Sequence, residues 1–233
     1  MIVDFQHHYT PRELFKADPD AGNKTYYDEN GVPGVVITSE FGTTLDDPAL
    51  DPFWEAAQAL GMYVFVHPAL KLDYGQQYDA FDLARSVGRE FSLVQATIRL
   101  INGGVLDRFP ELVVQFAHLS GGIASVLGRI RSYQDKEFWG TADNERHGSL
   151  PEHDFDYYLR NRLVFDTAGF CGDVRSVETT LVELPAERIV FASDYPQEIR
   201  ARDAVKDFVD GIRGLGAAGE TILDNTGLLI PGK

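Results

Sequence analysis

The sequence predicts an α/β fold with a parallel sheet, because short apolar runs alternate along the chain with helix-like segments. The runs are rich in Val, Ile, Leu and Phe without regular polar alternation, which is typical of strands buried on both faces. The chain has 233 residues, 44% of them hydrophobic, so it can form one domain around a sizeable core. The strand-like runs are 2–5, 34–38, 62–66, 112–116, 163–166 and 188–192.

Helix-like segments separate these runs and complete the alternation. We expect residues 1–233 to fold as a single domain, because no low-complexity linker and no internal repeat divides the chain. The segment 139–156 is rich in charged residues and histidine, and we expect it to be a long loop or lid after a strand. The predicted helices are 51–60, 81–102, 123–133, 174–184 and 201–215.

Composition and charge argue against several classes of function. The formal net charge of −15 disfavours binding to the phosphate backbone of nucleic acids. No run approaches the roughly 18 apolar residues of a membrane span, and the start of the sequence lacks the features of a signal peptide. The single cysteine, Cys171, cannot form an internal disulfide and fits a reducing compartment. We therefore expect a cytoplasmic protein that binds neither membranes nor nucleic acid.

Ionisable side chains follow directly on three of the apolar runs. His8, His67 and Asp194 each stand where a strand would end, so a parallel sheet would bring them to one mouth. Neutral imidazole and carboxylate together suit a borderline divalent ion such as Zn, Mn or Fe. A histidine after a strand is also often a structural residue, so spacing alone leaves both interpretations open.

Two further polar residues end strand-like runs. His118 precedes Gly121-Gly122 and could be a metal ligand or a general acid/base, since its free pKa is close to neutrality. Alternatively, the glycines there only allow close packing of a strand and a helix. Asp166 could orient an imidazole, but we expect it to have a structural role. Structural or solvent-exposed roles are also expected for His147, His153 and Cys171.

In this order, the motifs resemble the amidohydrolase-related group that contains the aminocarboxymuconate-semialdehyde decarboxylase and γ-resorcylate decarboxylase families. The resemblance covers most of the chain, and its motifs are weak singly but specific in combination. It implies a distorted (β/α)₈ barrel, as in TIM barrels, with one divalent metal ion; zinc is expected, with manganese or iron as alternatives. The motifs are Asp4-Phe5-Gln6-His7-His8-Tyr9-Thr10-Pro11, Leu45-Asp46-Asp47-Pro48, Phe53-Trp54, Val66-His67-Pro68, Phe109-Pro110-Glu111-Leu112, residues 118–129 and Phe191-Ala192-Ser193-Asp194-Tyr195-Pro196.

The resemblance also implies roles for individual residues. His118 would be the catalytic histidine beside the metal, a proton donor or base. Arg129 would reach the site of a neighbouring subunit and bind a substrate carboxylate, which a guanidinium can hold with two hydrogen bonds. We therefore expect a homodimer or a higher homo-oligomer. The implied metal ligands are Gln6, His8, His67 and Asp194.

Two features depart from the family pattern. The first metal-binding motif is commonly His-x-His, with Glu for the first His in some decarboxylases, whereas this chain has Gln6 there. An uncharged amide oxygen lowers metal affinity or favours a harder ion such as Mn. Between Pro33 and Gly34 the family has a stretch that supplies about two strand–helix units of the barrel, and this chain has no residues there.

The leading interpretation is a metal-dependent decarboxylase, a carbon–carbon lyase that acts on a small aromatic or unsaturated carboxylic acid. Protonation of the carbon that bears the carboxylate would precede loss of carbon dioxide. The same residues also suit hydrolysis or hydration by metal-activated water, with Asp194 as ligand and general base. A barrel that binds a ligand without catalysis is a third alternative, favoured by Gln6 and by the missing stretch.

Overall fold

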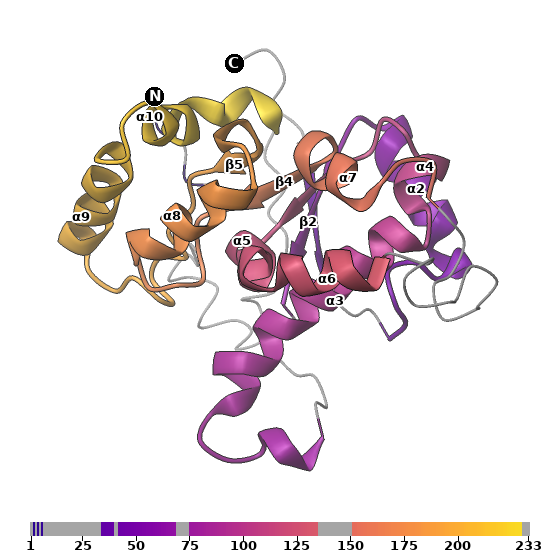
Figure 1. Cartoon of the computed structure of the whole chain (residues 1–233), viewed down its shortest axis with the longest axis horizontal. Helices are drawn as coiled ribbons and strands as arrows, with labels where there is room; N and C mark the ends of the chain where they lie inside the picture. Colours follow the sequence, from indigo (N-terminus) through magenta and orange to yellow (C-terminus); the bar gives the residue numbers. More distant parts are fainter. Residues whose placement is uncertain are drawn as a thin grey trace, which may run out of the picture.

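The computed structural model describes Ile2, Asp4, Gln6 and residues 34–39, 42–68, 75–134 and 151–229. Within them, a five-stranded parallel sheet has its strands side by side in sequence order (Figure 1). Helices connect successive strands, as parallel pairing requires. The predicted α/β fold is confirmed, and the predicted run 2–5 lies largely outside the described residues. The strands are β1 (Gly34–Thr38), β2 (Tyr63–His67), β3 (Val113–Phe116), β4 (Leu163–Asp166) and β5 (Ile189–Val190).

The register of the sheet brings the carboxyl ends of its strands to one level. His67, the last residue of β2, pairs with Thr38 at the end of β1. Phe116, the last residue of β3, pairs with Val66 on one side and with Phe165 on the other. The residues that follow these strands therefore lie along a common edge, where parallel sheets place their chemistry.

The longer helices follow the predicted segments closely, with two differences. The predicted helix 81–102 is interrupted, because Phe81 and Asp82 have φ values of 58° and 57° and a π-helix, η4 (Ala84–Gly88), precedes α3. The predicted helix 123–133 begins as the 3₁₀ helix η5 (Ile123–Val126). The longer helices are α2 (Asp51–Ala59), α3 (Arg89–Asn102), α6 (Leu127–Gln134), α8 (Val174–Glu183) and α9 (Arg202–Arg213).

Several short elements were not predicted. Helix α7 begins at Phe155, inside the predicted loop 139–156, because the Asp154 side chain accepts a hydrogen bond from the amide of Tyr157 at 2.9 Å and caps the helix. The other additions are α4 (Val105–Arg108), α5 (His118–Gly122), α7 (Phe155–Asn161), α10 (Ala217–Asp224) and the short helices η2 (Pro48–Leu50), η3 (Gln76–Tyr78), η7 (Ala186–Arg188) and η8 (Asn225–Leu228). None of the helices in the described part of the chain has the length and apolar character needed to span a membrane.

Two main hydrophobic clusters hold these elements together. The larger one packs β2, β3 and β4 against α2 and α3, and includes the fully buried Trp54, whose indole nitrogen donates to the carbonyl of Leu45 at 3.2 Å. The second joins β5 to α8, α9 and α10, with the rings of Phe191 and Phe208 5.6 Å apart. In Figure 1, α2 lies to the right of the strands, α3 lies below them, and α8, α9 and α10 lie to the left. The sheet therefore stands at the junction of both clusters.

The described N-terminal residues lie beside the segment that follows β5. The amide of Asp194 donates to the carbonyl of Gln6 at 2.8 Å, and the amide of Ser193 donates to the carboxylate of Asp4 at 2.9 Å. β1 lies at the opposite edge of the sheet. The start of the chain thus borders the last strand, as the first strand of a barrel does.

The short element α5 is a left-handed turn after β3, and it carries His118. The φ values from His118 to Gly122 are 57°, 50°, 55°, 66° and 70°, a conformation that costs residues with a side chain about 1–2 kcal/mol each. A Cβ atom on Gly121 would lie 1.9 Å from the carbonyl oxygen of Glu90, so only glycine fits there. The hydroxyls of Thr97 and Ser120, 2.6 Å apart, also tie the turn to α3. The turn is therefore seated directly on α3.

We expect Gly121→Ala to destabilise the protein far more than Gly61→Ala. Gly61 has a similar φ of 63° but nothing within 4 Å of an added Cβ, so this control carries only the backbone strain of about 1–2 kcal/mol. Gly121→Ala adds a backbone clash, which we expect to cost roughly 1–3 kcal/mol more. Urea unfolding of both variants measures the difference. Equal losses would mean that the turn can move away from α3.

Candidate active site

His118 lies at the centre of a buried polar cluster at the carboxyl ends of the strands. Its Nδ1 is 2.9 Å from Oε1 of Glu90 on α3, and its Nε2 is 3.2 Å from Nε2 of Gln6. The same Nε2 is 4.0 Å from Oδ2 of Asp194, and the ring of His67 lies edge-on with its centroid 5.7 Å away. Three residues selected from the sequence, Gln6, His67 and Asp194, thus come together around the imidazole of His118.

Three of the implied metal ligands are in this cluster, and their atoms suit a divalent cation. Nδ1 of His67 is 2.8 Å from the carbonyl of Pro68, so an Nδ1–H donates there and leaves the lone pair on Nε2, as in metal-binding histidines. Oε1 of Gln6 is buried and has no hydrogen-bond partner among the described residues. The amide oxygen of Gln6, the imidazole of His67 and the carboxylate of Asp194 are all groups that bind divalent metal ions as ligands.

The fourth implied ligand, His8, lies outside the described residues. Within the described ranges, no group of three or more His, Cys, Asp or Glu side chains could hold a metal ion. A cation site built from these elements therefore depends on the amide of Gln6 and on His8 in addition to His67 and Asp194.

Acidic side chains set the protonation state of His118. Burial by itself would lower the pKa of this imidazole, but the hydrogen bond to Glu90 and the negative charges of Glu90, Asp166 and Glu198 outweigh burial and raise the pKa from 6.5 to about 9. His118 is therefore protonated at neutral pH in the metal-free protein. The surrounding carboxylates also leave little positive charge for an anionic ligand, so such a ligand needs an additional cation in the site.

The Gln6 amide can meet both protonation states of His118. Its NH₂ group donates to Nε2 when the ring is neutral and carries its proton on Nδ1. After a half-turn of the amide, the oxygen accepts a hydrogen bond from the protonated ring. When no metal ion is bound to its oxygen, Gln6 can therefore remain bonded to His118 while a proton leaves or returns.

Asp166 holds the backbone of the turn rather than a side chain of the site. Its Oδ1 accepts hydrogen bonds from the amides of His118 at 2.9 Å and Ala168 at 3.1 Å, and its Oδ2 accepts from Gln115 at 2.8 Å. Burial raises the pKa of Asp166 to about 6, although the charge of His118 and these hydrogen bonds partly offset that rise. This geometry agrees with the structural role that we expected.

The remaining sequence candidates lie elsewhere. Arg129 is exposed on α6, where its guanidinium carbon stands 5.0 Å from the ring centroid of Tyr133 and Nη2 donates to the tyrosine hydroxyl at 3.3 Å. The ring of His153 packs 4.0 Å from that of Tyr157. Cys171 is exposed, and His147 is outside the described residues. The structure does not bring Arg129 into the cluster of its own chain.

Sequence reasoning missed two acidic residues near His118. Glu90 was hidden in what looked like one uninterrupted helix, 81–102, and no motif marks it. Glu198 contributes to the charge around His118, and its Oε2 accepts a hydrogen bond from the amide of Cys171 at 3.1 Å. Both residues are distant from His118 in sequence, so only the packing of α3 and of the segment after β5 reveals them.

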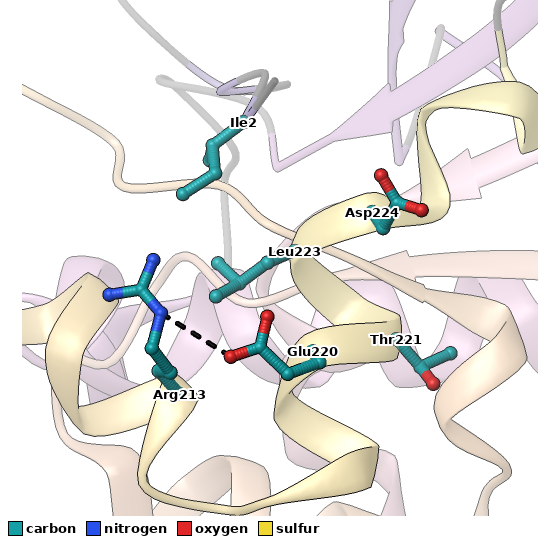
Figure 2. A pocket seen from close by; sticks show the side chains of 6 residues that line it. All are labelled: Ile2, Arg213, Glu220, Thr221, Leu223 and Asp224. Atoms are coloured by element: carbon teal, nitrogen blue, oxygen red, sulfur yellow. Dashed lines mark ion pairs between the residues drawn. The ribbon is translucent and has the colours of Figure 1, made fainter.

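A separate pocket of about 410 Å³ opens between Ile2 and helices α9 and α10 (Figure 2). The ion pair between Nε of Arg213 and Oε1 of Glu220, 3.3 Å apart, forms part of its wall. It shares no lining residue with the cluster around His118, so we do not assign the chemistry to it. The lining residues are Ile2, Arg213, Glu220, Thr221, Leu223 and Asp224.

The raised pKa of His118 predicts a pH-dependent stability in the metal-free protein. The folded state binds this proton more tightly than the unfolded chain does, so the stabilisation is complete below pH 6.5 and is lost as the pH rises through about 9. We expect the free energy of unfolding to fall by roughly 3 kcal/mol over this window. His118→Gln should flatten the dependence in urea unfolding at a series of pH values. An unchanged slope would assign it to other groups.

Comparison with known proteins shows decarboxylases among the relatives of this chain. It is 38% identical to 2-amino-3-carboxymuconate-6-semialdehyde decarboxylase from Dictyostelium discoideum over 103 residues, which are 44% of this chain and 28% of the relative. It is 26% identical to γ-resorcylate decarboxylase from Rhodococcus jostii over 199 residues, or 78% of this chain and 58% of the relative. The chain thus spans less than two thirds of the length of either protein.

Solved structures with the same fold include two manganese-bound enzymes. A dihydroxybenzoic acid decarboxylase from Polaromonas has a TM-score of 0.70 at 20% identity, covering 94% of this chain and 64% of that one. A 5-carboxyvanillate decarboxylase from Novosphingobium aromaticivorans has a TM-score of 0.72 at 21% identity, covering 85% and 56%. This likeness confirms the predicted barrel-type α/β fold. The amidohydrolase family matches residues 13–210, and the chain belongs to that family.

Proposed function

We propose that this chain is a metal-dependent decarboxylase that acts on a small aromatic carboxylic acid. The observation that carries the proposal is the buried His118, which is hydrogen-bonded to Glu90 through Nδ1 and faces Gln6 and Asp194 through Nε2. Such a ring can hold a proton at neutral pH and release it at one defined atom. The names of the relatives, which describe decarboxylases of aromatic or unsaturated acids, support this choice of reaction.

The proposed metal ligands are Gln6, His8, His67 and Asp194, as the resemblance implied. We favour manganese over the zinc that we first expected, because the neutral amide of Gln6 suits a hard ion and because two related structures hold manganese. When bound, the ion supplies the positive charge that holds the oxygen atoms of an acidic substrate and offsets the carboxylates around His118.

His118 provides the proton in the proposed reaction. The Nε2–H of the protonated imidazole transfers its proton to the substrate carbon that bears the carboxylate, and a π-electron pair of the substrate's aromatic ring forms the new C–H bond. The bond between that carbon and the carboxylate then breaks, its electron pair returns to the aromatic ring of the substrate, and carbon dioxide leaves. His118 is left neutral, with its Nδ1–H still bonded to Glu90, and takes up a proton from solvent for the next turnover.

We also propose that residues 1–233 form one domain of a cytoplasmic homodimer or higher homo-oligomer. Arg129 is exposed on α6, outside the cluster of its own chain, so it is available to a neighbouring subunit. A guanidinium there would hold the carboxylate of the substrate with two hydrogen bonds. It would also add positive charge to a chain whose net charge is −15.

The reaction can be tested with manganese-loaded protein and a panel of hydroxylated benzoic acids. We expect release of carbon dioxide, loss of activity after chelation, and a decrease in kcat of about 10²-fold or more in His118→Gln, because the proton donor is gone. His153→Gln is the matched control, since its ring packs on Tyr157 away from the cluster. Water addition to a lactone or enol without carbon dioxide release would instead favour the hydrolase interpretation.

The role of Arg129 can be tested by mixing inactive variants. If Arg129 acts on the partner's site, subunits carrying Arg129→Ala and subunits carrying His118→Gln should regain activity when reassembled together, because one site then has both residues. Light scattering should show a dimer or larger assembly. A monomer at micromolar concentration, or no regain of activity in mixed assemblies, would contradict this role.

A further inference from the structure

We propose that Glu90 is a positioning residue that holds the His118 ring through Nδ1 and so keeps Nε2 directed toward the substrate site. This inference rests on the proposed function for its kinetic consequences. Oε1 of Glu90 is 2.9 Å from Nδ1 of His118, and the exposed fractions of the two side chains are 16% and 5%. Little water can compete for this hydrogen bond, so it determines how the ring is turned.

The hydrogen bond persists in both protonation states that the reaction requires. Nδ1 carries a proton in the doubly protonated ring and also in the neutral ring whose lone pair is on Nε2. Glu90 stabilises both forms over the neutral ring with its proton on Nε2. Proton exchange is therefore confined to Nε2, which faces Gln6 and Asp194.

Backbone packing keeps Glu90 and His118 in place. The carbonyl of Glu90 lies against Gly121 so closely that a Cβ atom there would be 1.9 Å from its oxygen. On the other side, a Cβ atom on Gly169 would lie 2.2 Å from Cγ of His118. The turn, the His118 ring and the start of α3 therefore form one closely packed unit. The ring cannot shift far toward α3 or toward Gly169.

Nothing else in the described cluster explains a carboxylate at this position. Oε2 of Glu90 is buried and has no hydrogen-bond partner among the described residues, so the side chain is not held by a wider network there. Removing a carboxylate from water costs free energy unless a hydrogen bond replaces the lost hydration. The hydrogen bond between Oε1 and Nδ1 of His118, 2.9 Å apart, is the one that does so.

The kinetic test compares Glu90→Ala, Glu90→Gln and the surface control Glu178→Ala in manganese-loaded protein. We expect kcat to fall about 10²-fold in Glu90→Ala with KM changed less than about threefold, because the substrate still binds but the proton donor is misplaced. Glu90→Gln keeps an acceptor for Nδ1–H and should recover about tenfold of that loss. Glu178→Ala should match the wild type. A wild-type kcat in Glu90→Ala would overturn the proposal.

A second measurement tests the hydrogen bond without any turnover. In ¹⁵N-histidine-labelled, metal-free protein, the Nδ1–H proton of His118 should give a slowly exchanging resonance, assigned by its loss in His118→Gln. We expect that resonance in the wild type, in Glu178→Ala and in Glu90→Gln, and its disappearance in Glu90→Ala. Its persistence in Glu90→Ala would overturn the proposal.

The two measurements separate failure of this inference from failure of the proposed function. If the wild type decarboxylates no acid in the panel, the proposed function is wrong, but the Nδ1–H resonance still decides whether Glu90 holds the ring. Far-UV circular dichroism of each variant identifies a folding defect. If Glu90→Ala fails to fold, the isosteric variant Glu90→Gln decides instead. Loss of the Nδ1–H resonance in Glu90→Gln would contradict the proposal. A kcat of Glu90→Gln equal to that of the wild type would also contradict it.

Discussion

The hydrogen bond between Glu90 and His118 joins α3 to the turn that follows β3. That turn is left-handed over five residues, and its strain is tolerated because α3 and the carboxylate of Asp166 hold it on two sides. Gly121 and Gly169 let the backbone and the ring approach as closely as this geometry requires. The position of His118, the candidate proton donor, thus depends on the packing of α3, the turn and the segment that contains Gly169.

Electrostatics in the cluster connect this packing to chemistry. The carboxylates of Glu90, Asp166 and Glu198 raise the pKa of His118 despite its burial, so the ring carries a proton at neutral pH. The same charges repel an acidic substrate, and the chain as a whole is strongly acidic. A divalent cation at Gln6, His67 and Asp194, with arginine from another subunit, would resolve this conflict. The carboxylates that keep His118 protonated therefore also make the binding of an acidic substrate depend on an added cation.

Much of this arrangement could be predicted from the sequence. Continuous apolar runs predicted the strands, and four of them were placed within a residue at either end; β5 is shorter than its predicted run because only Ile189 and Val190 pair with β4. The polar residues after the runs predicted which end of the sheet carries the cluster, because parallel strands end on one side. Two helices were misjudged at their starts, since positive φ values at Phe81 and Asp82 and the left-handed turn override helical periodicity.

The sequence by itself determined the parallel α/β fold, the edge of the sheet that carries His67, His118 and Asp194, and membership of the family, because these follow from local patterns and from the order of motifs along the chain. Only the tertiary structure decided that Glu90 meets the His118 ring and that Asp166 binds the backbone of the turn. Those contacts join residues 28 and 48 positions apart, and no local pattern encodes them. Their physical cause is the close approach of α3, the turn and β4, which exists only once the sheet has formed.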